Sequence, residues 1–492
     1  MDHRTDETIK KIDHIFNPRS VAYVGASGNP GKWGYITLSN LIAAGFGGPI
    51  YPINPKANEI LGRKVYRSVE ALPEVPDLAV IVVPPPSVVP AVRACGEKGI
   101  RAGIVITAGF AELGERSGGL QQELADAARE GGMVLVGPNC NGAMNPRAKV
   151  HIQFPPFLAP PGPIAVVSQS GNVVDSLARQ IMLRGFGCSK CVSTGNEAVL
   201  HTEDYLRYLA QDPDTKVILS YIEGFKDGRR FLEVAGEVSR KKPIVMLKVG
   251  KTRAGARAAM SHTASIAGAD SVFEAACRQA GVIRAEGLDD LLDIGLAFLR
   301  QPLPKGRRVG VVTSGGGWGV LAADASNERG FDVIPLPDEV LKELDGFLPA
   351  WWNRGNPVDL VAGSMGEPIF KCVDALLRSE SVDAAMVMGI MTALAGKRHP
   401  TASDKDGRTR WGAELTQGVV DVMERFNGMA EQYEKPVIVA TEHMFADAIL
   451  ESRIVHALGQ SNSVCYSMPH RAVAVLDALT RYGKYVGRMG VA

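Results

Sequence analysis

The chain has 492 residues, too many for one hydrophobic core, and its length predicts about three domains at roughly 100–200 residues each. Its 54 Lys and Arg residues nearly balance its 53 Asp and Glu residues, so the net charge of +1 argues against general nucleic-acid binding and against a polybasic membrane surface. The seven scattered cysteines form no disulfide framework, the charged N-terminus has no signal-peptide core, and no apolar run reaches membrane-spanning length. These features predict a cytoplasmic protein of several domains.

Short apolar runs rich in Val and Ile alternate with helical patterns along the whole chain. Runs that are apolar on both faces are typical of central parallel strands. The predicted strands are Val21–Gly25, Ile50–Ile53, Leu78–Val83, Ala102–Thr107, Met133–Val136, Ile164–Ser168, Val217–Ile222, Pro243–Val249, Val309–Thr313, Ala384–Met388 and Pro436–Ala440. Helices are predicted over Gly119–Glu130, Val173–Arg184 and Asp338–Leu344. The alternation predicts an α/β protein with doubly wound parallel sheets.

Two proline-rich stretches divide this pattern. Residues 154–163 read FPPFLAPPGP and residues 301–308 read QPLPKGRR, and neither suits a helix or a central strand. We therefore predict domains at residues 1–150, 155–300 and 305–492. Each opens with an apolar strand, a Gly/Ser turn and a helix, which indicates one architecture used three times. The polar stretch at 391–434 predicts an exposed excursion.

The first Gly turn indicates a phosphate-bearing ligand. It carries four glycines at intervals of three residues: Gly25, Gly28, Gly31 and Gly34. Glycine lets backbone N–H groups approach a ligand, and a following helix N-terminus favours phosphate. The second strand ends in Asn54-Pro55-Lys56, and a cation there suits a phosphorylated ribose, as in coenzyme A (CoA) or NADP, better than NAD. A tight turn without a ligand is the alternative.

Other strands of this segment also end in small or polar residues. Val83-Pro84, Thr107-Ala108 and Asn139-Cys140 each follow a predicted strand. Because ligands bind at the carboxyl ends of parallel strands, these ends should meet at one edge of the sheet. The predicted cofactor-binding residues are Gly25, Ser27, Gly28, Gly34, Asn54, Lys56, Val83, Pro84, Thr107, Ala108, Asn139 and Cys140.

The second Gly/Ser turn predicts an anion site at a helix N-terminus. Its predicted phosphate-binding residues are Ser168, Ser170, Gly171 and Asn172, although the same residues could serve as helix caps. The strand at 217–222 ends in Glu223, whose carboxylate could accept a hydrogen bond from an imidazole and fix its tautomer. A solvated surface carboxylate is the alternative at Glu223.

His262 has the most informative context of the nine histidines. It lies in a run of small residues that also carries Lys251, Arg253 and Arg257, so the segment could move and tolerate an anion nearby. A neutral imidazole nitrogen can attack phosphorus, and the resulting phosphoramidate keeps a high transfer potential. A structural or merely exposed histidine is the alternative.

Two other motifs are less informative. Cys188 and Cys191 form a C-x-x-C motif without a second pair, so we predict no zinc site and no other metal site in the chain. The glycine turn at 315–319 lacks the G-K-[ST] ending of a nucleotide P-loop, and we predict a structural or interdomain role for it.

Nine stretches in chain order carry a family resemblance. They read GASGNPGKWGY, YPINPK, GPNCNGAMNP, VSQSGN, STGNEA, EGFKDGRR, SHTASIAG, TSGGGWGVLAADA and GNPVDL. The chain resembles the α subunit of the NDP-forming acyl-CoA synthetases, which are relatives of succinyl-CoA synthetase. The resemblance implies a Rossmann-like CoA-binding domain followed by two flavodoxin-like domains. It also implies that His262 is transiently phosphorylated, that Glu223 contacts the phosphohistidine, and that Ser168, Ser170 and Gly171 hold phosphate. Ala264 replaces a glycine that the family often has after the histidine.

The resemblance further implies a missing part. The family passes phosphate between the histidine and a nucleotide in an ATP-grasp module, for which the three segments leave no length. We therefore expect a separate β subunit, in an α2β2 assembly, that supplies ADP or ATP with Mg²⁺. The substrates would be a small carboxylic acid or its acyl-CoA, with phosphate. Two alternatives stay open: a non-catalytic CoA-binding or regulatory protein, and an NADP-dependent oxidoreductase.

Overall fold

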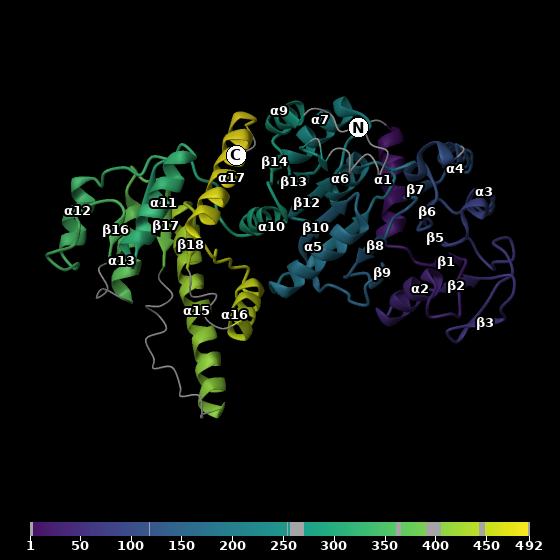
Figure 1. The fold of residues 1–492 in the computed structure, drawn as a ribbon, viewed down its shortest axis with the longest axis horizontal. Helices are drawn as coiled ribbons and strands as arrows, with labels where there is room; N and C mark the ends of the chain where they lie inside the picture. Colours follow the sequence, from purple (N-terminus) through teal and green to yellow (C-terminus); the bar gives the residue numbers. More distant parts are fainter. Residues whose placement is uncertain are drawn as a thin grey trace. The chain divides into compact units, whose positions relative to one another are not determined.

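The computed structural model contains two compact units. The first comprises residues 1–182 and 187–285, and the second comprises residues 183–186 and 286–492. Figure 1 labels most of the elements of both units. The structure describes residues 3–117, 119–252, 254–255, 270–360, 366–389, 405–441 and 448–490. Within these ranges no helix has the length and apolarity that a membrane crossing needs.

The first sheet of the first unit has five parallel strands. Its strands are β1 (Val21–Val24), β2 (Ile50–Ile53), β5 (Leu78–Ile81), β6 (Ala102–Val105) and β7 (Val134–Val136). Its helices are α1 (His3–Phe16), α2 (Trp33–Ala43), α3 (Val88–Lys98) and α4 (Leu120–Glu130), with 3-10 turns η1 (Pro85–Ser87) and η2 (Ala111–Ser117) and a hairpin of β3 (Glu59–Ile60) and β4 (Arg63–Lys64). In the spatial order β2-β1-β5-β6-β7, the chain first adds β2 on one side of β1 and then adds β5, β6 and β7 on the other side. The boundary between β1 and β5 is therefore the switch point of a doubly wound sheet.

The second sheet of the first unit repeats this order. Its parallel strands are β10 (Pro161–Ser168), β11 (Cys188–Ser193), β12 (Val217–Ile222), β13 (Ile244–Lys248) and β14 (Ile283–Arg284), and an antiparallel pair, β8 (Gly142–Asn145) and β9 (Val150–Ile152), extends the β11 edge. The helices are α5 (Gly171–Leu183), α6 (Thr202–Gln211), α7 (Gly228–Ser239) and α9 (Asp270–Ala280). Figure 1 shows α6 and α7 on one face of this sheet and α5 on the other. The switch point lies between β10 and β12.

The second unit contains a third sheet with the order β16-β15-β17-β18. Its strands are β15 (Val309–Thr313), β16 (Val358–Asp359), β17 (Ala384–Met388) and β18 (Val437–Ala440). Its helices are α10 (Leu288–Ala297), α11 (Gly316–Glu328), α12 (Asp338–Asp345), α13 (Glu367–Arg378), α15 (Lys405–Tyr433), α16 (Ala448–Gln460) and α17 (Pro469–Arg488). In each of the three sheets, the first parallel strand in chain order (β1, β10 or β15) lies between the next two. The predicted α/β class with a repeated parallel architecture is therefore confirmed.

Burial explains why the strand predictions succeed. Every residue of β1, β5, β6, β15 and β17 is buried, so these strands are apolar on both faces. The structure adds α1 and the β8–β9 pair, which the sequence did not predict. β10 begins at Pro161, inside the predicted proline-rich break, because proline is tolerated in the first residues of a strand. The predicted limits of the three domains stay a prediction.

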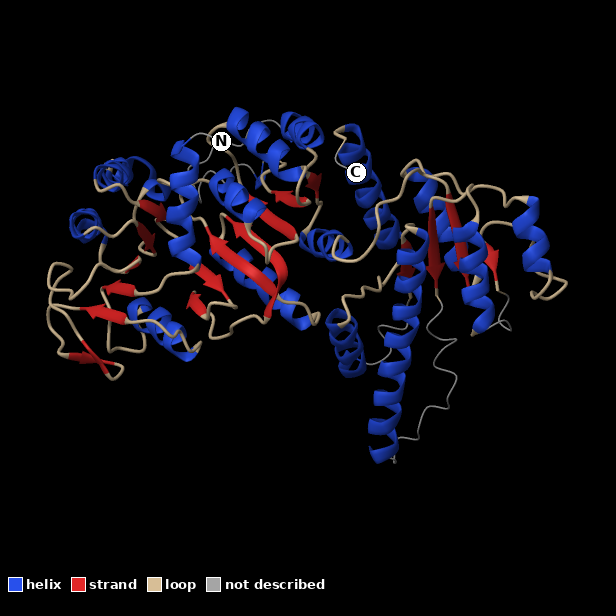
Figure 2. Cartoon of the chain, turned by 180° about the vertical axis from the view of Figure 1, so that it is seen from behind, coloured by secondary structure: helices blue, strands red, loops and turns tan. Residues whose placement is uncertain are grey.

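The expectation of an exposed excursion at 391–434 is wrong over its described C-terminal part. There α15, the long helix in Figure 2, buries Val419, Met423, Phe426 and Ala430 in the core beside the third sheet. These residues recur at intervals of three and four, which places them on one face of the helix. The many polar residues of the opposite face concealed this pattern.

Candidate active site

A cavity of the first unit lies at the carboxyl ends of its strands. It has a volume of about 610 Å³, and residues after β1, β5, β6 and β7 line it together with the turn between β10 and α5. The switch points of both sheets of this unit contribute to it, at Gly25 after β1 and at Ser170 after β10. Such switch points are where doubly wound sheets bind ligands.

Two glycines bring the backbone of the first turn close to its neighbours. Gly25 has a φ of 92°, and a Cβ atom there would lie 2.3 Å from the carbonyl oxygen of Val82. A Cβ atom on Gly34, in the first turn of α2, would lie 2.3 Å from the carbonyl oxygen of Gly25. The N-terminus of α2 therefore packs directly on the turn, where its free N–H groups favour an anion.

Polar side chains fasten the strand ends to one another. Asn54 donates from Nδ2 to the carbonyl oxygen of Ala26 at 2.8 Å, and Thr107 donates from Oγ1 to the carbonyl oxygen of Val83 at 2.7 Å. The backbone N–H of Asn139 donates to the carbonyl oxygen of Thr107 at 2.9 Å. These predicted binding residues thus also fix the shape of the cavity wall.

The second turn presents the N-terminus of α5 to the same cavity. The Oγ atom of Ser168 donates to the carbonyl oxygen of Ser170 at 2.7 Å and accepts from its N–H at 3.1 Å. Ser168 is fully buried and shapes the turn, whereas Ser170, Gly171 and Asn172 line the cavity. The positive end of the α5 dipole therefore faces the ligand space.

Glu223 lies beside this turn and is buried, with 4% of its surface exposed. It follows β12, the neighbour of β10 at the switch point. The Oε1 atom of Gln169 accepts hydrogen bonds from the backbone N–H of Glu223 at 2.6 Å and from the backbone N–H of Gly224 at 3.2 Å. The alternative of a solvated carboxylate at Glu223 is therefore wrong. His262 lies outside the described residues, so its predicted contact with Glu223 stays a prediction.

The structure brings most of the predicted site residues to one cavity. Those that line it are Gly25, Ser27, Gly34, Asn54, Val83, Pro84, Thr107, Ala108, Asn139, Cys140, Ser170, Gly171 and Asn172. Gly28 and Lys56 are exposed and lie outside its lining, and Ser168 and Glu223 also do not line it.

An aromatic pair on the cavity wall was not predicted. Trp33 stacks on Phe154 with ring centroids 4.1 Å apart, and 53% of the Trp33 surface is exposed. Asn40 holds the segment of Phe154 against α2, because its Nδ2 atom donates to the carbonyl oxygen of Gln153 at 2.7 Å. The exposed tryptophan in the glycine turn is a sequence signal for such a contact, whereas the proline-rich stretch that contains Phe154 indicates only a break between domains.

Cys140 also lines this cavity but has an unreactive thiol. Its Sγ atom donates to the carbonyl oxygen of Val105 at 3.3 Å. Burial raises the pKa of the Cys140 thiol to about 12, so it carries almost no thiolate at neutral pH. Cys140 therefore forms part of the wall and does not act as a nucleophile.

Asn141 connects the cavity wall to a buried carboxyl group. Its Oδ1 atom accepts the N–H of Phe154 at 3.0 Å, and its Nδ2 atom donates to Asp175 on α5. Burial raises the pKa of Asp175 to about 7, although the hydrogen bond from Asn141 opposes the shift. Among the described residues, no hydrogen-bond donor reaches the buried Oδ1 atom of Asp175.

We expect Asp175 to make stability depend on pH below neutrality. Its folded-state pKa of about 7 exceeds the unfolded value of about 3.9, so the folded chain binds more protons between these limits. The free energy of unfolding should therefore fall as pH rises from about 4 to about 7, by up to roughly 4 kcal/mol from this group. In Asp175→Asn that contribution should disappear, as denaturant unfolding at several pH values can measure. Equal slopes in the two proteins would contradict the assignment.

Comparison with known proteins supplies the family. The chain is 38% identical over 476 residues to the acetate–CoA ligase (ADP-forming) II subunit alpha of Pyrococcus furiosus, covering 97% of this chain and 99% of that protein. The chain belongs to the family of ADP-forming acetate–CoA ligase α subunits. It is also 40% identical over 357 residues to the acetate–CoA ligase (ADP-forming) of Methanocaldococcus jannaschii, where the match covers 73% of this chain and 50% of that protein.

Domain models and a solved structure agree with this family. Residues 19–146 match a CoA binding domain, residues 161–298 a succinyl-CoA ligase like flavodoxin domain, and residues 309–490 a ligase-CoA domain. The dinucleotide-forming acetyl-coenzyme A synthetase 1 of Ca. Korarchaeum cryptofilum, solved in complex with phosphate and ADP, is similar with a TM-score of 0.82 and 33% identity, covering 97% of this chain and 98% of that chain. The family consists of acid–thiol ligases, so membership favours a ligase over the oxidoreductase and non-catalytic alternatives.

Proposed function

We propose that this chain, with a nucleotide-binding β subunit, interconverts acyl-CoA, phosphate and ADP with a small carboxylic acid, CoA and ATP. The observation that supports this most strongly is the single cavity of about 610 Å³ to which both predicted binding sets contribute. The strand ends of the first sheet would hold CoA there, and the start of α5 would hold phosphate. Attack of phosphate on the carbonyl carbon of a thioester requires the two ligands to lie side by side.

The first step forms an acyl phosphate in this cavity. A phosphate oxygen attacks the thioester carbonyl carbon, a C–O bond forms, the C–S bond breaks, and CoA leaves as a thiolate that then takes up a proton. The N–H groups at the start of α5, beyond Ser170, stabilise the negative charge of phosphate. The exposed Lys32, which lines the cavity at the start of α2, adds a positive charge for the phosphate groups of CoA.

The second step moves the phosphoryl group to His262. An imidazole nitrogen attacks phosphorus, a P–N bond forms, the P–O bond to the acyl group breaks, and the carboxylate leaves. Glu223, buried beside the second turn, would hold the imidazole in the required tautomer. A terminal phosphate oxygen of ADP then takes the phosphoryl group, which breaks the P–N bond and regenerates the imidazole.

The nucleotide site belongs to the partner in this proposal. The Methanocaldococcus relative is about twice as long as the part that this chain matches, which is consistent with a further module in a separate chain. Among the described residues, no group of three His, Cys, Asp or Glu side chains could hold a metal ion. We assign Mg²⁺, which neutralises phosphate charge in phosphoryl transfer, to the nucleotide site of a β subunit in an α2β2 assembly.

Two measurements test the proposal. The chain alone should bind CoA in a calorimetric titration and should leave NADPH fluorescence unchanged. With the β subunit added, acetyl-CoA, phosphate and ADP should yield ATP, whereas the chain alone should yield none. Binding of NADPH in place of CoA, or failure to form ATP from several acyl-CoA esters with the β subunit present, would overturn the proposal.

A further inference from the structure

Gln169 lies at the switch point of the second sheet, directly after β10 (Figure 1). Its backbone N–H donates to the carbonyl oxygen of Tyr221 at 3.1 Å, which extends the pairing of β10 with β12 by one bond. The residue is partly buried and lines the cavity of the first unit. Its neighbours Ser168 and Ser170 are predicted phosphate-binding residues, and its own place in the site depends on what its side chain holds.

The Gln169 side chain acts like the peptide group of an additional strand. Besides accepting the N–H groups of Glu223 and Gly224 at Oε1, it donates from Nε2 to the carbonyl oxygen of Gly224 at 2.9 Å. β12 ends at Ile222, so this side chain takes over where the backbone pairing stops. Glu223 and Gly224 are buried, and a buried N–H without an acceptor costs free energy. The amide therefore fixes the backbone from which the Glu223 side chain projects.

The same amide also acts on a second carboxyl group. Glu197, which follows β11, is 3% exposed. Burial raises the pKa of Glu197, whereas hydrogen bonds from Thr202, Thr194 and Gln169 oppose that shift. A glutamine amide has two acceptor sites and two N–H groups, so its contacts with Glu197 and with residues 223–224 account for its hydrogen-bonding capacity. Gln169 therefore acts on the site through the residues that it holds.

The third sheet shows that the turn itself does not need such an amide. After β15, the Oγ1 atom of Thr313 donates to the carbonyl oxygen of Gly315 at 2.8 Å and accepts from its N–H at 3.2 Å, as in the second turn. Ser314 takes the place of Gln169 there, and its Oγ atom donates to the carbonyl oxygen of Gly389. Because the same turn forms around a short side chain, the longer reach of Gln169 serves the segment after β12.

We propose that Gln169 is a positioning residue for phosphoryl transfer, whose amide ties the turn at the start of α5 to Glu223. This inference rests on the proposed function, in which that turn holds phosphate and Glu223 orients the imidazole. The tie would keep the phosphate and the carboxylate at one spacing. A displacement of about 1 Å in a reacting group can lower a rate by about 10²-fold.

Amide hydrogen exchange of the full chain tests the tie without any assumption about the reaction. Gln169→Met keeps the length of the side chain but loses its amide, so the N–H groups of Glu223 and Gly224 should exchange at least about tenfold faster. Mass spectrometry of overlapping peptides across residues 217–227 can measure this. Gln279→Met, which removes an exposed amide from α9, should leave that exchange unchanged. Equal exchange in Gln169→Met and the wild type would overturn the proposal.

Formation of ATP in the presence of the β subunit tests the consequence for the reaction. Gln169→Met should lower kcat at least about tenfold, because the carboxylate of Glu223 loses its fixed position. Affinity for CoA should stay that of the wild type, because the strand ends proposed to hold CoA belong to the first sheet. Gln279→Met should match the wild type in both measurements.

Gln169→Glu distinguishes positioning from general packing. Its ionised carboxylate cannot donate to Gly224 and would be repelled by the carboxyl group of Glu197, whereas a protonated carboxyl group can donate as the amide does. Its activity, divided by that of the wild type at the same pH, should rise at least about threefold from pH 8 to pH 5.5. The same ratio for Gln169→Met should stay constant.

These measurements separate the inference from the function on which it rests. If the wild type forms no ATP from any acyl-CoA, the proposed function fails and the positioning role fails with it, whatever the exchange rates show. If the wild type is active and Gln169→Met has the same kcat, the positioning role alone fails. An activity ratio of Gln169→Glu that does not change with pH would also refute the role of the amide.

Discussion

Replacing His262 with Asn should abolish transfer of the γ-phosphoryl group of ATP to this chain in the presence of its β subunit. Asparagine keeps a polar side chain of similar reach but has no nucleophilic nitrogen, because its amide lone pair is delocalised. Without a phosphoryl acceptor the reaction has no route between acyl phosphate and nucleotide. Labelling by radioactive ATP should fall at least about 10³-fold, as expected when a covalent nucleophile is removed.

His470→Asn is the matched control for this experiment. His470 is exposed in the first turn of α17, and its substitution should leave labelling unchanged. The label on the wild-type chain should be lost in acid and kept in base, which distinguishes a phosphoramidate from a phosphate ester. CoA binding by His262→Asn should stay intact, which separates loss of chemistry from loss of folding. Equal labelling of wild type and His262→Asn would exclude His262 as the carrier.

Gly34→Ala should damage the proposed CoA-binding cavity although alanine is the better helix former. The added Cβ atom would lie 2.3 Å from the carbonyl oxygen of Gly25, which is a backbone atom and cannot rotate away. The N-terminus of α2 must therefore move off the first turn. We expect a loss of about 1–3 kcal/mol in the free energy of unfolding, as for other overpacked sites, and CoA affinity at least tenfold lower.

Gly47→Ala provides the comparison for Gly34→Ala. Gly47 follows the same helix, and no described atom lies within 4 Å of the place where its Cβ would be. Its substitution should leave both the thermal unfolding temperature and the CoA titration close to those of the wild type. If Gly34→Ala binds CoA as tightly as Gly47→Ala does, the packing of α2 on the first turn does not shape the site.

The positions of the strand ends could be predicted from the sequence because the strands are parallel. Parallel strands align their carboxyl ends, so Gly25, Val83 and Asn139 had to meet at one edge although more than fifty residues separate each from the next. The same logic places Glu223 beside Ser170, on neighbouring strands of the second sheet. Local apolar runs and glycine turns are sufficient for this inference, because they show where each strand ends and the repeated strand–helix pattern indicates that the strands are parallel.

Contacts made by a segment with no regular pattern could not be predicted in this way. Phe154 reaches the cavity because Asn40 holds carbonyl groups of the segment after β9, a contact across 113 residues or more. The pKa of Asp175 likewise depends on how deeply α5 is buried against Asn141, which no local pattern records. The amphipathic face of α15 was concealed because its buried residues are spaced among many charged ones.

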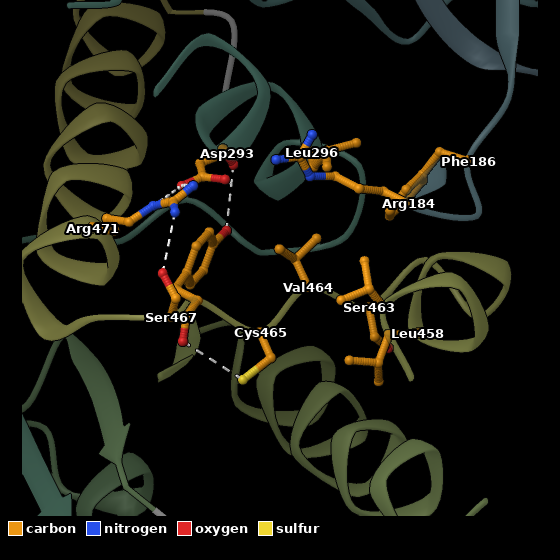
Figure 3. A pocket seen from close by; sticks show the side chains of 12 residues that line it. Arg184, Phe186, Asp293, Leu296, Leu458, Ser463, Val464, Cys465, Ser467 and Arg471 are labelled. Carbon is orange, nitrogen blue, oxygen red and sulfur yellow. Dashed lines mark hydrogen bonds and ion pairs between the residues drawn. The ribbon is translucent and has the colours of Figure 1, made fainter. Parts of the chain in front are cut away.

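The second unit presents the same difficulty in another form. Arg184 follows a helix of the first unit in sequence, yet it packs with α16, more than 250 residues later. Two glycines permit this approach, but each appears in the sequence as an ordinary helix-ending residue. The cavity that Arg184 lines in the second unit (Figure 3) therefore has no signature in the sequence.

The environment of Cys140 has a consequence for redox chemistry. Disulfide exchange starts from a thiolate, and a thiol with a pKa of about 12 supplies roughly one thiolate in 10⁵ molecules at pH 7. A coenzyme that carries its own sulfur could otherwise become trapped as a mixed disulfide on a cysteine of the cavity wall. Cys140 should therefore resist forming a mixed disulfide with oxidised CoA, which leaves the sulfur of a coenzyme in this cavity free to form thioesters.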